Sequence, residues 1–295
     1  MTDSDHSPEI AFPSSQLRTD AIGFDALGRL HKRLSECSSD TVIIDCARLF
    51  WLDGHLSSPF LTVLNHCRAR HVTISFKGLK PDVRLLLRKN GLLEERAVDS
   101  HHTTIPVTTF GLHEEVAFAD FSRSHLARPE MPKMSKALQA KIFEAVDELF
   151  ANCALHSKSP LRVVTAGQFF PRTHRLAFAI SDGGRGVDGS LRASKISFTS
   201  PTDAIDWAME GNNTTRKGDI PGGLGLKLLR RFIERNQGKL TVVSNAGYWC
   251  QEAARVRRAV LRNPFPGTAV ILEISTSDRN SYDLAGAAPR PEDIW

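Results

Sequence analysis

Several features that mark particular protein classes are missing from this 295-residue sequence. Its five cysteines, at positions 37, 46, 67, 153 and 250, form no Cys-x-x-Cys pair, which argues against a zinc site and favours reduced, buried thiols. No stretch reaches the roughly 18 consecutive apolar residues of a membrane-spanning helix, and the polar start MTDSDHSPEI has no apolar signal core. We therefore expect a soluble, cytoplasmic protein with no membrane segment.

A strong charge of one sign is also absent. Lysine and arginine number 38 against 33 aspartates and glutamates, a formal net charge of +5. The basic residues are scattered apart from Arg230-Arg231 and the run at 255–258, which we interpret as solvated surface rather than as a nucleic-acid-binding patch. With 41% hydrophobic residues, the chain can form ordinary cores, and its length fits two domains.

The first hundred residues alternate between helix and strand patterns. After a polar segment over 1–24, with a short edge strand at 9–12, apolar residues at helical spacing predict three helices. Between them, two apolar runs predict buried strands over 41–46 and 71–76. Such alternation is typical of a small α/β unit. The predicted helices cover 24–37, 57–68 and 81–90, the last ending at Gly91.

A helical segment in the middle of the chain carries two side-chain stripes. The apolar stripe, at about 100° per residue, consists of Ile142, Val146, Leu149 and Cys153. Beside it, Glu148, Asn152 and His156 recur at i, i+4 and i+8, so that a carboxylate and an amide project to the same side one turn apart. Taken alone, the polar stripe also fits an ordinary surface helix, for which Ser135 is a candidate N-cap.

Three glycine-containing motifs follow this helix. The apolar run 176–180 predicts a buried strand that ends at Asp182, before Gly184 and Gly186, an arrangement that suits close approach to a flat, hydrogen-bonding heterocycle. Gly223-Leu224-Gly225 opens a helical pattern, and the free N–H groups at a helix N-terminus favour phosphate. Gly267-Thr268 precedes an alternating run that predicts another strand.

The order of these motifs resembles the ATP-binding domain shared by gyrase, Hsp90, the histidine kinases and MutL, the GHKL superfamily with its Bergerat fold. The resemblance covers residues 126–277 and implies a two-layer α/β sandwich. Within the superfamily, the segment Glu148–His156 is most similar to the matching helix of the anti-sigma-factor serine kinases. The polar stretch 188–221, with a short helix at 204–209, would be the mobile lid over the nucleotide.

The same resemblance implies a role for each matching residue. Glu148 would be the catalytic general base that orients water or a protein hydroxyl toward the γ-phosphate. Asn152 would hold Mg²⁺, and Asp182 would accept a hydrogen bond from the adenine amino group. Lys217, or its neighbour Arg216, would meet the γ-phosphate. The residues that would contact ATP are Asn152, Asp182, Gly184, Gly186, Lys217, Gly223, Leu224, Gly225 and Thr268.

The amino-terminal unit, residues 25–99, resembles a STAS domain, the fold of the anti-sigma-factor antagonists. That family carries an Asp-Ser-Ser-Gly type motif whose second serine is phosphorylated by the cognate kinase. Here Asp53 matches the aspartate, but Gly54 and His55 occupy the serine positions. The acceptor hydroxyl is missing from its expected place, although two serines follow at 57 and 58. A generic α/β domain is an equal alternative for this unit.

The remaining segments lack a clear match. Residues 100–125 are interpreted as a linker, in which His101-His102 is solvated rather than a metal site or phosphoacceptor, and no helical hairpin of the sensor-histidine-kinase type precedes the ATP domain. The arginine-rich stretch 248–264 is predicted to be an inserted helix that could contact a partner. Residues 278–295 are polar and proline-rich, and are predicted to be a disordered tail.

Two functions remain open at this stage. One is a Mg²⁺-dependent serine/threonine kinase or ATPase of the anti-sigma-factor type, acting on a STAS-type protein or sigma-factor regulator in a protein-interaction switch. The other is a non-catalytic module whose ATP-dependent closure controls partner binding or homodimerisation. A gyrase- or Hsp90-like machine is a weaker third reading, because the chain lacks the additional domains those proteins use.

Overall fold

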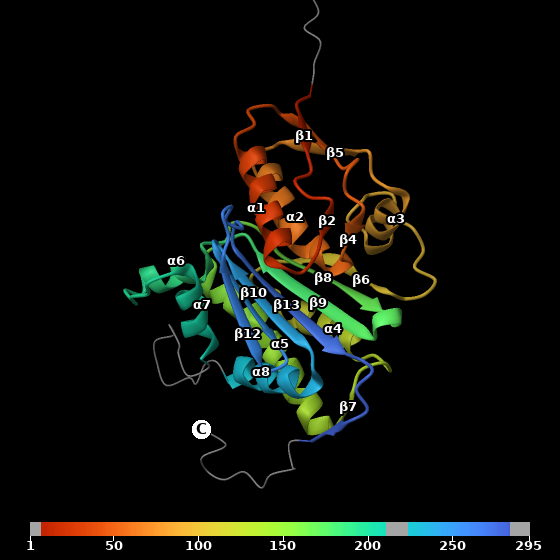
Figure 1. The fold of residues 1–295 in the computed structure, drawn as a ribbon, viewed down its shortest axis with the longest axis vertical. Helices are drawn as coiled ribbons and strands as arrows, with labels where there is room; N and C mark the ends of the chain where they lie inside the picture. Colours follow the sequence, from red (N-terminus) through yellow and green to blue (C-terminus); the bar gives the residue numbers. More distant parts are fainter. Residues whose placement is uncertain (1–6, 211–223, 284–295) are drawn as a thin grey trace, which may run out of the picture.

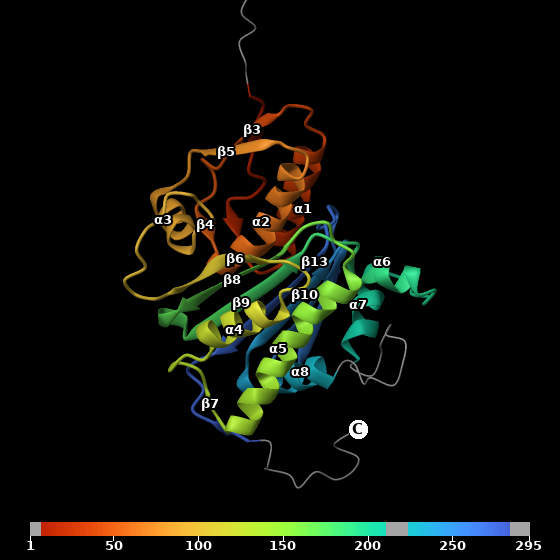
Figure 2. The same cartoon turned by 180° about the vertical axis from the view of Figure 1, so that it is seen from behind.

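A seven-stranded sheet forms the centre of the molecule, and the computed structural model describes it within residues 7–210 and 224–283 (Figures 1 and 2). All neighbouring strands in this sheet are antiparallel. Helices pack on both faces, so the chain is a mixed α/β sandwich, as predicted. In order across the sheet the strands are β12 (Arg255–Val260), β11 (Gly247–Glu252), β10 (Lys239–Ser244), β13 (Thr268–Ser275), β9 (Arg175–Asp182), β8 (Val163–Phe170) and β6 (Thr104–Phe110).

The helix that carries Glu148 and Asn152 lies across one face of this sheet (Figure 2). Ser135 caps it as predicted, because its hydroxyl accepts a hydrogen bond from the Leu138 amide at 3.2 Å. Stacked rings of Phe118 and Phe150, 4.5 Å apart, fix the neighbouring helix against it. The helices on this side of the sheet are α4 (Glu115–Leu126), α5 (Lys136–His156), α6 (Gly186–Ala193), α7 (Pro201–Met209) and α8 (Leu224–Asn236).

The amino-terminal unit has the alternating helices and strands that the sequence predicts. Its three-stranded sheet is parallel, with β3 between β1 and β5. The third helix ends at Gly91, whose positive φ of 79° closes it as expected. The elements are β1 (Glu9–Ala11), β2 (Gln16–Leu17), α1 (Ala21–Ser35), β3 (Thr41–Asp45), β4 (Trp51–Leu52), η1 (Gly54–Leu56), α2 (Ser57–Arg68), β5 (Thr73–Lys77) and α3 (Pro81–Asn90).

This unit packs directly on the second face of the seven-stranded sheet (Figure 1). One continuous hydrophobic cluster joins the two, with apolar residues of α1 and α2 against Val164, Ala179 and Ile271 of the sheet. Phe24 of α1 and Phe265, in the loop before β13, are both fully buried, and their rings meet edge to face at 5.7 Å. The two units therefore share a core rather than being joined by a loose connection.

The predicted linker over 100–125 is wrong. Residues 104–110 form β6, the strand at one end of the seven-stranded sheet, and 115–126 form α4. The helix buries Phe118, Ser122 and Leu126, which are four residues apart, a spacing that the polar composition concealed. The amino-terminal boundary also differs, because α1 begins at Ala21 and the polar segment before it buries Leu17 completely.

The predicted inserted helix over 248–264 is also wrong, because these residues form most of the hairpin of β11 and β12. Neighbouring residues alternate between faces with the period of two that a strand requires, Tyr248 and Cys250 facing the amino-terminal unit while Trp249 faces the helices. Three of the four arginines in this stretch, Arg255, Arg257 and Arg258, lie on the outermost strand, β12. At the carboxyl end, β14 (Ser281–Tyr282) pairs with β7 (Lys133–Met134), so the predicted tail is ordered there, and its residues 284–295 lie outside the described part.

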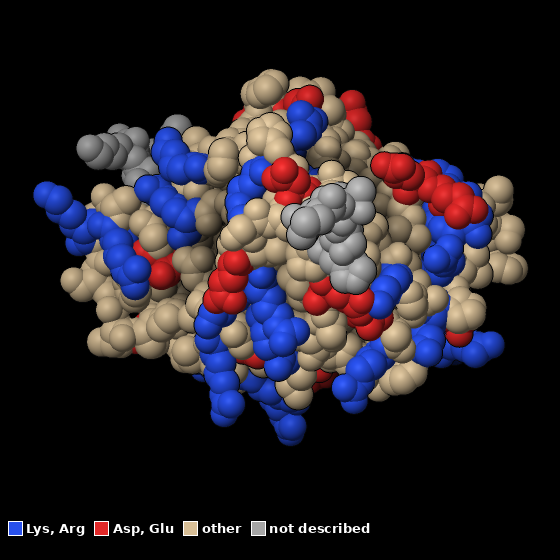
Figure 3. Space-filling model, turned by 90° about the horizontal axis from the view of Figure 1, so that it is seen from above, with Lys and Arg blue, Asp and Glu red and all other residues tan. Residues whose placement is uncertain are grey.

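Two surface properties follow from the described residues. No helix among them is long and apolar enough to cross a membrane. Seen from the side of the amino-terminal unit, the basic side chains lie in separate groups with acidic ones between them (Figure 3).

Candidate functional site

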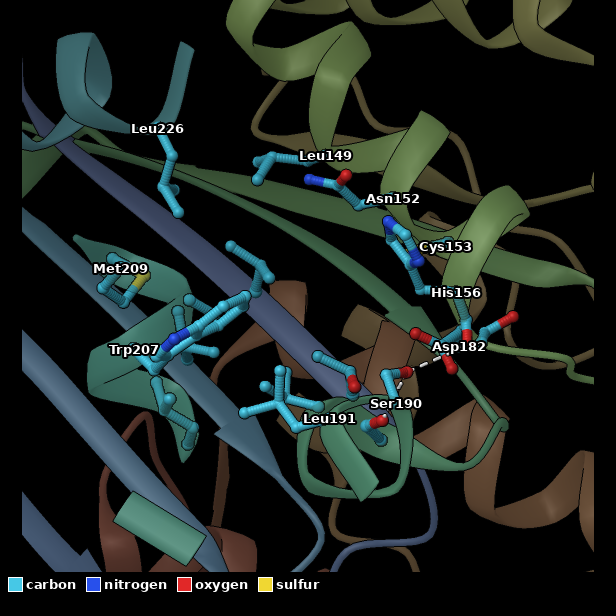
Figure 4. Close-up of a pocket in the computed structure, with 18 of the residues that line it drawn as sticks. Leu149, Asn152, Cys153, His156, Asp182, Ser190, Leu191, Trp207, Met209 and Leu226 are labelled. Atoms are coloured by element: carbon cyan, nitrogen blue, oxygen red, sulfur yellow. Dashed lines mark hydrogen bonds between the residues drawn. The ribbon is translucent and has the colours of Figure 1, made fainter. Parts of the chain in front are cut away.

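A cavity of about 170 Å³ lies between the helices and the sheet, far above the roughly 10–15 Å³ that admits one water molecule. Its walls are mostly apolar and come from α5, α6, α7, α8 and the strands β9, β10 and β13 (Figure 4). The lining includes Glu148, Asn152, Cys153, His156, Asp182, Gly186, Leu191, Ile205, Trp207, Met209, Leu226, Val242, Thr268 and Val270.

Two polar side chains of α5 lie one helical turn apart at this cavity. Figure 4 shows the amide of Asn152 pointing into it. The Glu148 carboxylate lies at the N-terminus of α8, where its Oε2 accepts a hydrogen bond from the Gly225 amide at 3.0 Å. A Cβ at position 225 would come within 2.4 Å of that oxygen and 2.9 Å of the Ala145 Cα. Glycine at 225 is therefore what lets α8 begin against α5.

Asp182, the last residue of β9, supplies a buried carboxylate at the other end of the cavity. It is only 3% exposed, and its Oδ1 accepts a hydrogen bond from the Gly184 amide at 2.8 Å. Burial raises the pKa of Asp182 to about 6, against the lowering effect of the hydrogen bonds from Gly184 and the Cys153 thiol. Burial and the neighbouring Asp182 in turn raise the pKa of Cys153 well above its usual range.

The glycines that follow Asp182 pack closely against the protein itself. A Cβ at Gly184 would lie 2.2 Å from the Ser157 carbonyl oxygen, and one at Gly186, where φ is +75°, would lie 2.4 Å from Nδ2 of Asn245. Between them, the Arg185 amide donates to the Ser157 carbonyl and its Nε to the His156 carbonyl, both at the end of α5. The loop thereby ties the end of β9 to the end of α5.

Thr268 lies beside Asp182, because the two residues are register partners on β13 and β9. Its Oγ1 is 3.1 Å from Oγ of Ser244 on β10, and it lines the cavity. The turn before it is equally tight: a Cβ at Gly267, where φ is +133°, would lie 2.0 Å from the Asp182 carbonyl oxygen. The Gly-Thr pair therefore closes the same end of the cavity that Asp182 occupies.

The structure brings most of the residues predicted for the site together. Those that line one cavity are Glu148, Asn152, Asp182, Gly186 and Thr268. Gly184 and Gly225 each bind one of these carboxylates through a backbone amide. Lys217, with its alternative Arg216, and Gly223 lie outside the described residues, as does the side chain of Leu224. For 188–221, the predicted lid, the described part forms α6 and α7, which wall the cavity.

Sequence reasoning missed the part of the site that α7 supplies. It predicted a short helix here but gave none of its side chains a role. Trp207 and Met209 face the cavity from the side opposite Asn152 and His156 (Figure 4). The available signal was a tryptophan in an otherwise polar stretch, since a large aromatic ring beside a predicted nucleotide site is a candidate stacking surface.

Among the described residues no group of three His, Cys, Asp or Glu could hold a metal ion. The donor set at the cavity is instead one amide, Asn152, near one carboxylate, Glu148. Such a set fits Mg²⁺, which keeps several of its waters and takes only one or two protein ligands when phosphates supply the rest.

Comparison with known proteins gives a distant similarity to a solved structure. No protein-family model matches the sequence, and no curated protein matches it. Among solved structures, the chain is similar to the histidine kinase domain from the Erythrobacter litoralis EL346 blue-light activated histidine kinase, at 16% sequence identity and a TM-score of 0.28. The match covers 55% of this chain and 63% of that one, so the chain spans less than two thirds of that structure.

Proposed function

We propose that this chain binds ATP in the cavity between α5, α7 and β9 and acts as a GHKL-type kinase or ATPase of the anti-sigma-factor serine kinase kind. The observation that carries the proposal is the meeting of a buried carboxylate, Asp182, with Glu148 and Asn152 of α5 in one largely apolar cavity. A carboxylate only 3% exposed is costly unless a hydrogen-bond donor satisfies it. An adenine amino group would be a further donor beside the Gly184 amide and the Cys153 thiol, and the apolar walls suit its ring.

The phosphates would extend toward the N-terminus of α8. A helix start carries free N–H groups and a positive partial charge of about half an electron charge, which favours phosphate oxygens. Mg²⁺, when bound, would neutralise phosphate charge, and Asn152, which lines the cavity, would hold it. Glu148 is close to the same helix start, where it could accept a proton from an attacking water or hydroxyl.

The phosphoacceptor in this proposal belongs to another protein. The two serines next to the STAS-like motif, Ser57 and Ser58, are fully buried and hydrogen-bonded inside the chain, to Asn90 and to Ser181. Neither hydroxyl is accessible to the cavity on the opposite face of the sheet. A STAS-type protein or sigma-factor regulator is the partner class that the motif resemblance suggests, with homodimerisation and a cytoplasmic location as further parts of the proposal.

A second function has one specific observation in its favour. Oε2 of Glu148 already accepts a hydrogen bond from the Gly225 amide, so this carboxylate also has a structural role between α5 and α8. If that role is its only one, the chain is a nucleotide-gated binding module without turnover. In such a module the loss of the Glu148 carboxylate would affect helix packing and not the γ-phosphate.

The test is turnover of γ-labelled ATP with Mg²⁺, in which free phosphate and protein-bound label are counted separately with candidate STAS-type proteins present. The variants are Glu148→Gln and Asn152→Ala, and the matched control is Glu144→Ala, an exposed carboxylate one turn earlier on α5 that pairs with Lys141. We expect turnover to fall by about 100-fold or more in Glu148→Gln, in line with the typical contribution of a general base, while ATP stays bound. Binding with no product in the wild type would establish the gated module, and no ATP binding at all would refute the proposal.

A further inference from the structure

Helix α2 of the amino-terminal unit presents three polar residues to the back of the nucleotide site. Ser58, Thr62 and His66 are spaced four residues apart and so lie on one face of the helix. Ser58 and Thr62 are buried, although such residues on an amphipathic helix are usually solvated. Each has its partner on the seven-stranded sheet or in the turns at its edge. We call these three residues the α2 stripe.

The two hydroxyls of the α2 stripe meet Ser181, the residue before Asp182. Oγ of Ser181 is 2.8 Å from Ser58 Oγ and 2.7 Å from Thr62 Oγ1, and Ser58 donates to the Val164 carbonyl at 2.9 Å. Each hydroxyl has one hydrogen, and Ser58 uses its own on a carbonyl, so Ser181 donates to Ser58. Thr62 Oγ1 then donates to Ser181 at 2.7 Å, the shorter of its two contacts, the other being to the Ser58 carbonyl at 3.3 Å. The result is a chain of donors in which each of these three hydroxyls has a partner.

Strand alternation places the two halves of this arrangement on opposite faces. Side chains of consecutive residues in a strand point to opposite sides of the sheet. Accordingly Ala179 belongs to the core shared with the amino-terminal unit, and Ile180 to the core under the helices. By the same alternation, the Ser181 side chain points toward the amino-terminal unit and the Asp182 side chain toward the helices. The hydrogen bonds from α2 to Ser181 therefore act on the strand backbone that also carries the Asp182 carboxylate.

His66 secures the turn that follows. Its Nε2 donates to the Pro266 carbonyl at 3.1 Å, because a carbonyl only accepts. A Cβ on Gly183 would lie 2.8 Å from the same nitrogen, so the imidazole packs directly on that glycine. Pro266 in turn precedes Gly267, which contacts the Asp182 carbonyl oxygen. The backbone on both sides of Asp182 is thus held by α2.

We propose that the α2 stripe positions Asp182 for adenine recognition, which makes the amino-terminal unit part of the nucleotide site. This inference rests on the proposed ATP function. Ser58, Thr62 and His66 are positioning residues, since they act through Ser181 and Gly183 and touch no nucleotide. Any ligand or partner that moves α2 would then change the affinity for ATP, and ATP would change the affinity for that partner by the same factor.

The experiment uses the full chain with Thr62→Val, which keeps the side-chain shape and removes the hydroxyl. Thr62→Ser, which keeps the hydroxyl, tests rescue. The matched control is Ser57→Ala, the neighbouring buried hydroxyl of α2, whose partner is Asn90 inside the amino-terminal unit. Two quantities are measured: amide hydrogen exchange across residues 180–186 without nucleotide, and the affinities for ATP and for inosine triphosphate, which lacks the 6-amino group.

We expect Thr62→Val to speed exchange across 180–186 and to weaken ATP binding about three- to tenfold, the loss expected for one buried hydrogen bond. Binding of inosine triphosphate should stay within twofold, which a general loss of stability would not produce. Thr62→Ser and Ser57→Ala should behave like the wild type.

Unchanged exchange, or an equal loss for both nucleotides, would overturn the inference while leaving ATP binding in place. If the wild type binds no nucleotide, the proposed function fails, and with it the assignment of the α2 stripe to adenine recognition. The exchange data would still show whether α2 holds the Asp182 turn.

Discussion

Two adjacent residues of β9, Ser181 and Asp182, bury their polar groups in opposite ways on the two faces of the seven-stranded sheet. Ser181 faces the amino-terminal unit, where its hydroxyl is part of a complete hydrogen-bond chain. Asp182 faces the helices, where its carboxylate borders a cavity and is ionised only above a raised pKa of about 6. A buried polar group with all its hydrogen bonds made fixes how two layers pack. A buried charge beside a cavity instead lowers stability and is a candidate contact for a ligand.

The largest effect should come from truncating the packed face. Phe265→Ala removes a fully buried ring that contacts Phe24 across the unit boundary. We expect the free energy of unfolding to fall by roughly 3–5 kcal/mol, because the transfer free energy of the buried ring is lost and a cavity remains in its place. Unfolding by denaturant should remain a single transition, since the core is shared. The control is Val260→Ala on the edge strand β12, where the side chain is 60% exposed and we expect little change in stability. Two separate unfolding transitions would contradict the inference that the two units share one core.

On the cavity face, Asp182→Asn should move binding and stability in opposite directions. The amide cannot offer two acceptor oxygens, so we expect ATP affinity to fall roughly 10- to 100-fold. Stability at pH 8 should rise, because the buried charge is gone. A rise in pKa from 3.8 to about 6, at roughly 1.4 kcal/mol per pH unit, corresponds to a gain on the order of 3 kcal/mol. Calorimetry and nucleotide titration measure both, and a destabilised variant would contradict this account of Asp182.

The same carboxylate predicts a pH dependence with a defined sign. Below about pH 6 Asp182 takes up a proton, so ATP affinity should fall by up to about tenfold per pH unit. The ligand-free fold should respond in the opposite sense. Because the folded pKa exceeds the ordinary 3.8, the Asp182 contribution to stability decreases as pH rises from about 4 to about 6 and is constant above. Both trends should be absent in Asp182→Asn, and their persistence there would assign them to another group.

The smallest effect concerns the cavity wall opposite α5. If Trp207 stacks on the adenine ring, Trp207→Ala should weaken ATP binding about three- to tenfold, the range expected for one aromatic contact, and Trp207→Phe should recover part of the loss. Phe50→Ala, an exposed aromatic of the amino-terminal unit, is the control. Equal losses for the tryptophan and phenylalanine variants would indicate that the indole acts through packing of α7 instead.

Local patterns were sufficient for much of this architecture. The stripe on α5, the Ser135 cap and the stop at Gly91 depend on neighbouring residues, and the structure confirms all three. Strand β6 could not be predicted in the same way, because its partner β8 lies more than 50 residues away and three threonines make the segment look like a solvated connection. Propensity gives little information where pairing with a distant strand decides the structure.

The candidate site could likewise be predicted only where short sequence motifs determine it. The motif order predicted which residues of α5, β9 and β13 would meet, and five of them line one cavity. The contribution of Trp207 depends on how α7 packs on β11, which no short pattern encodes. The docking of α2 behind Ser181 was equally hidden, since Ser58 and Thr62 look like ordinary surface residues of an amphipathic helix until the sheet covers them.

The shared core also has a consequence for how such a protein can respond to its surroundings. A switch made of two separate proteins depends on their concentrations, because mass action sets how much complex exists. Here the two units are present at a fixed ratio of one to one, and dilution cannot separate them, since they share one hydrophobic cluster. Its state would therefore not follow the relative abundance of its two halves. It would follow the molecules that bind to the finished assembly.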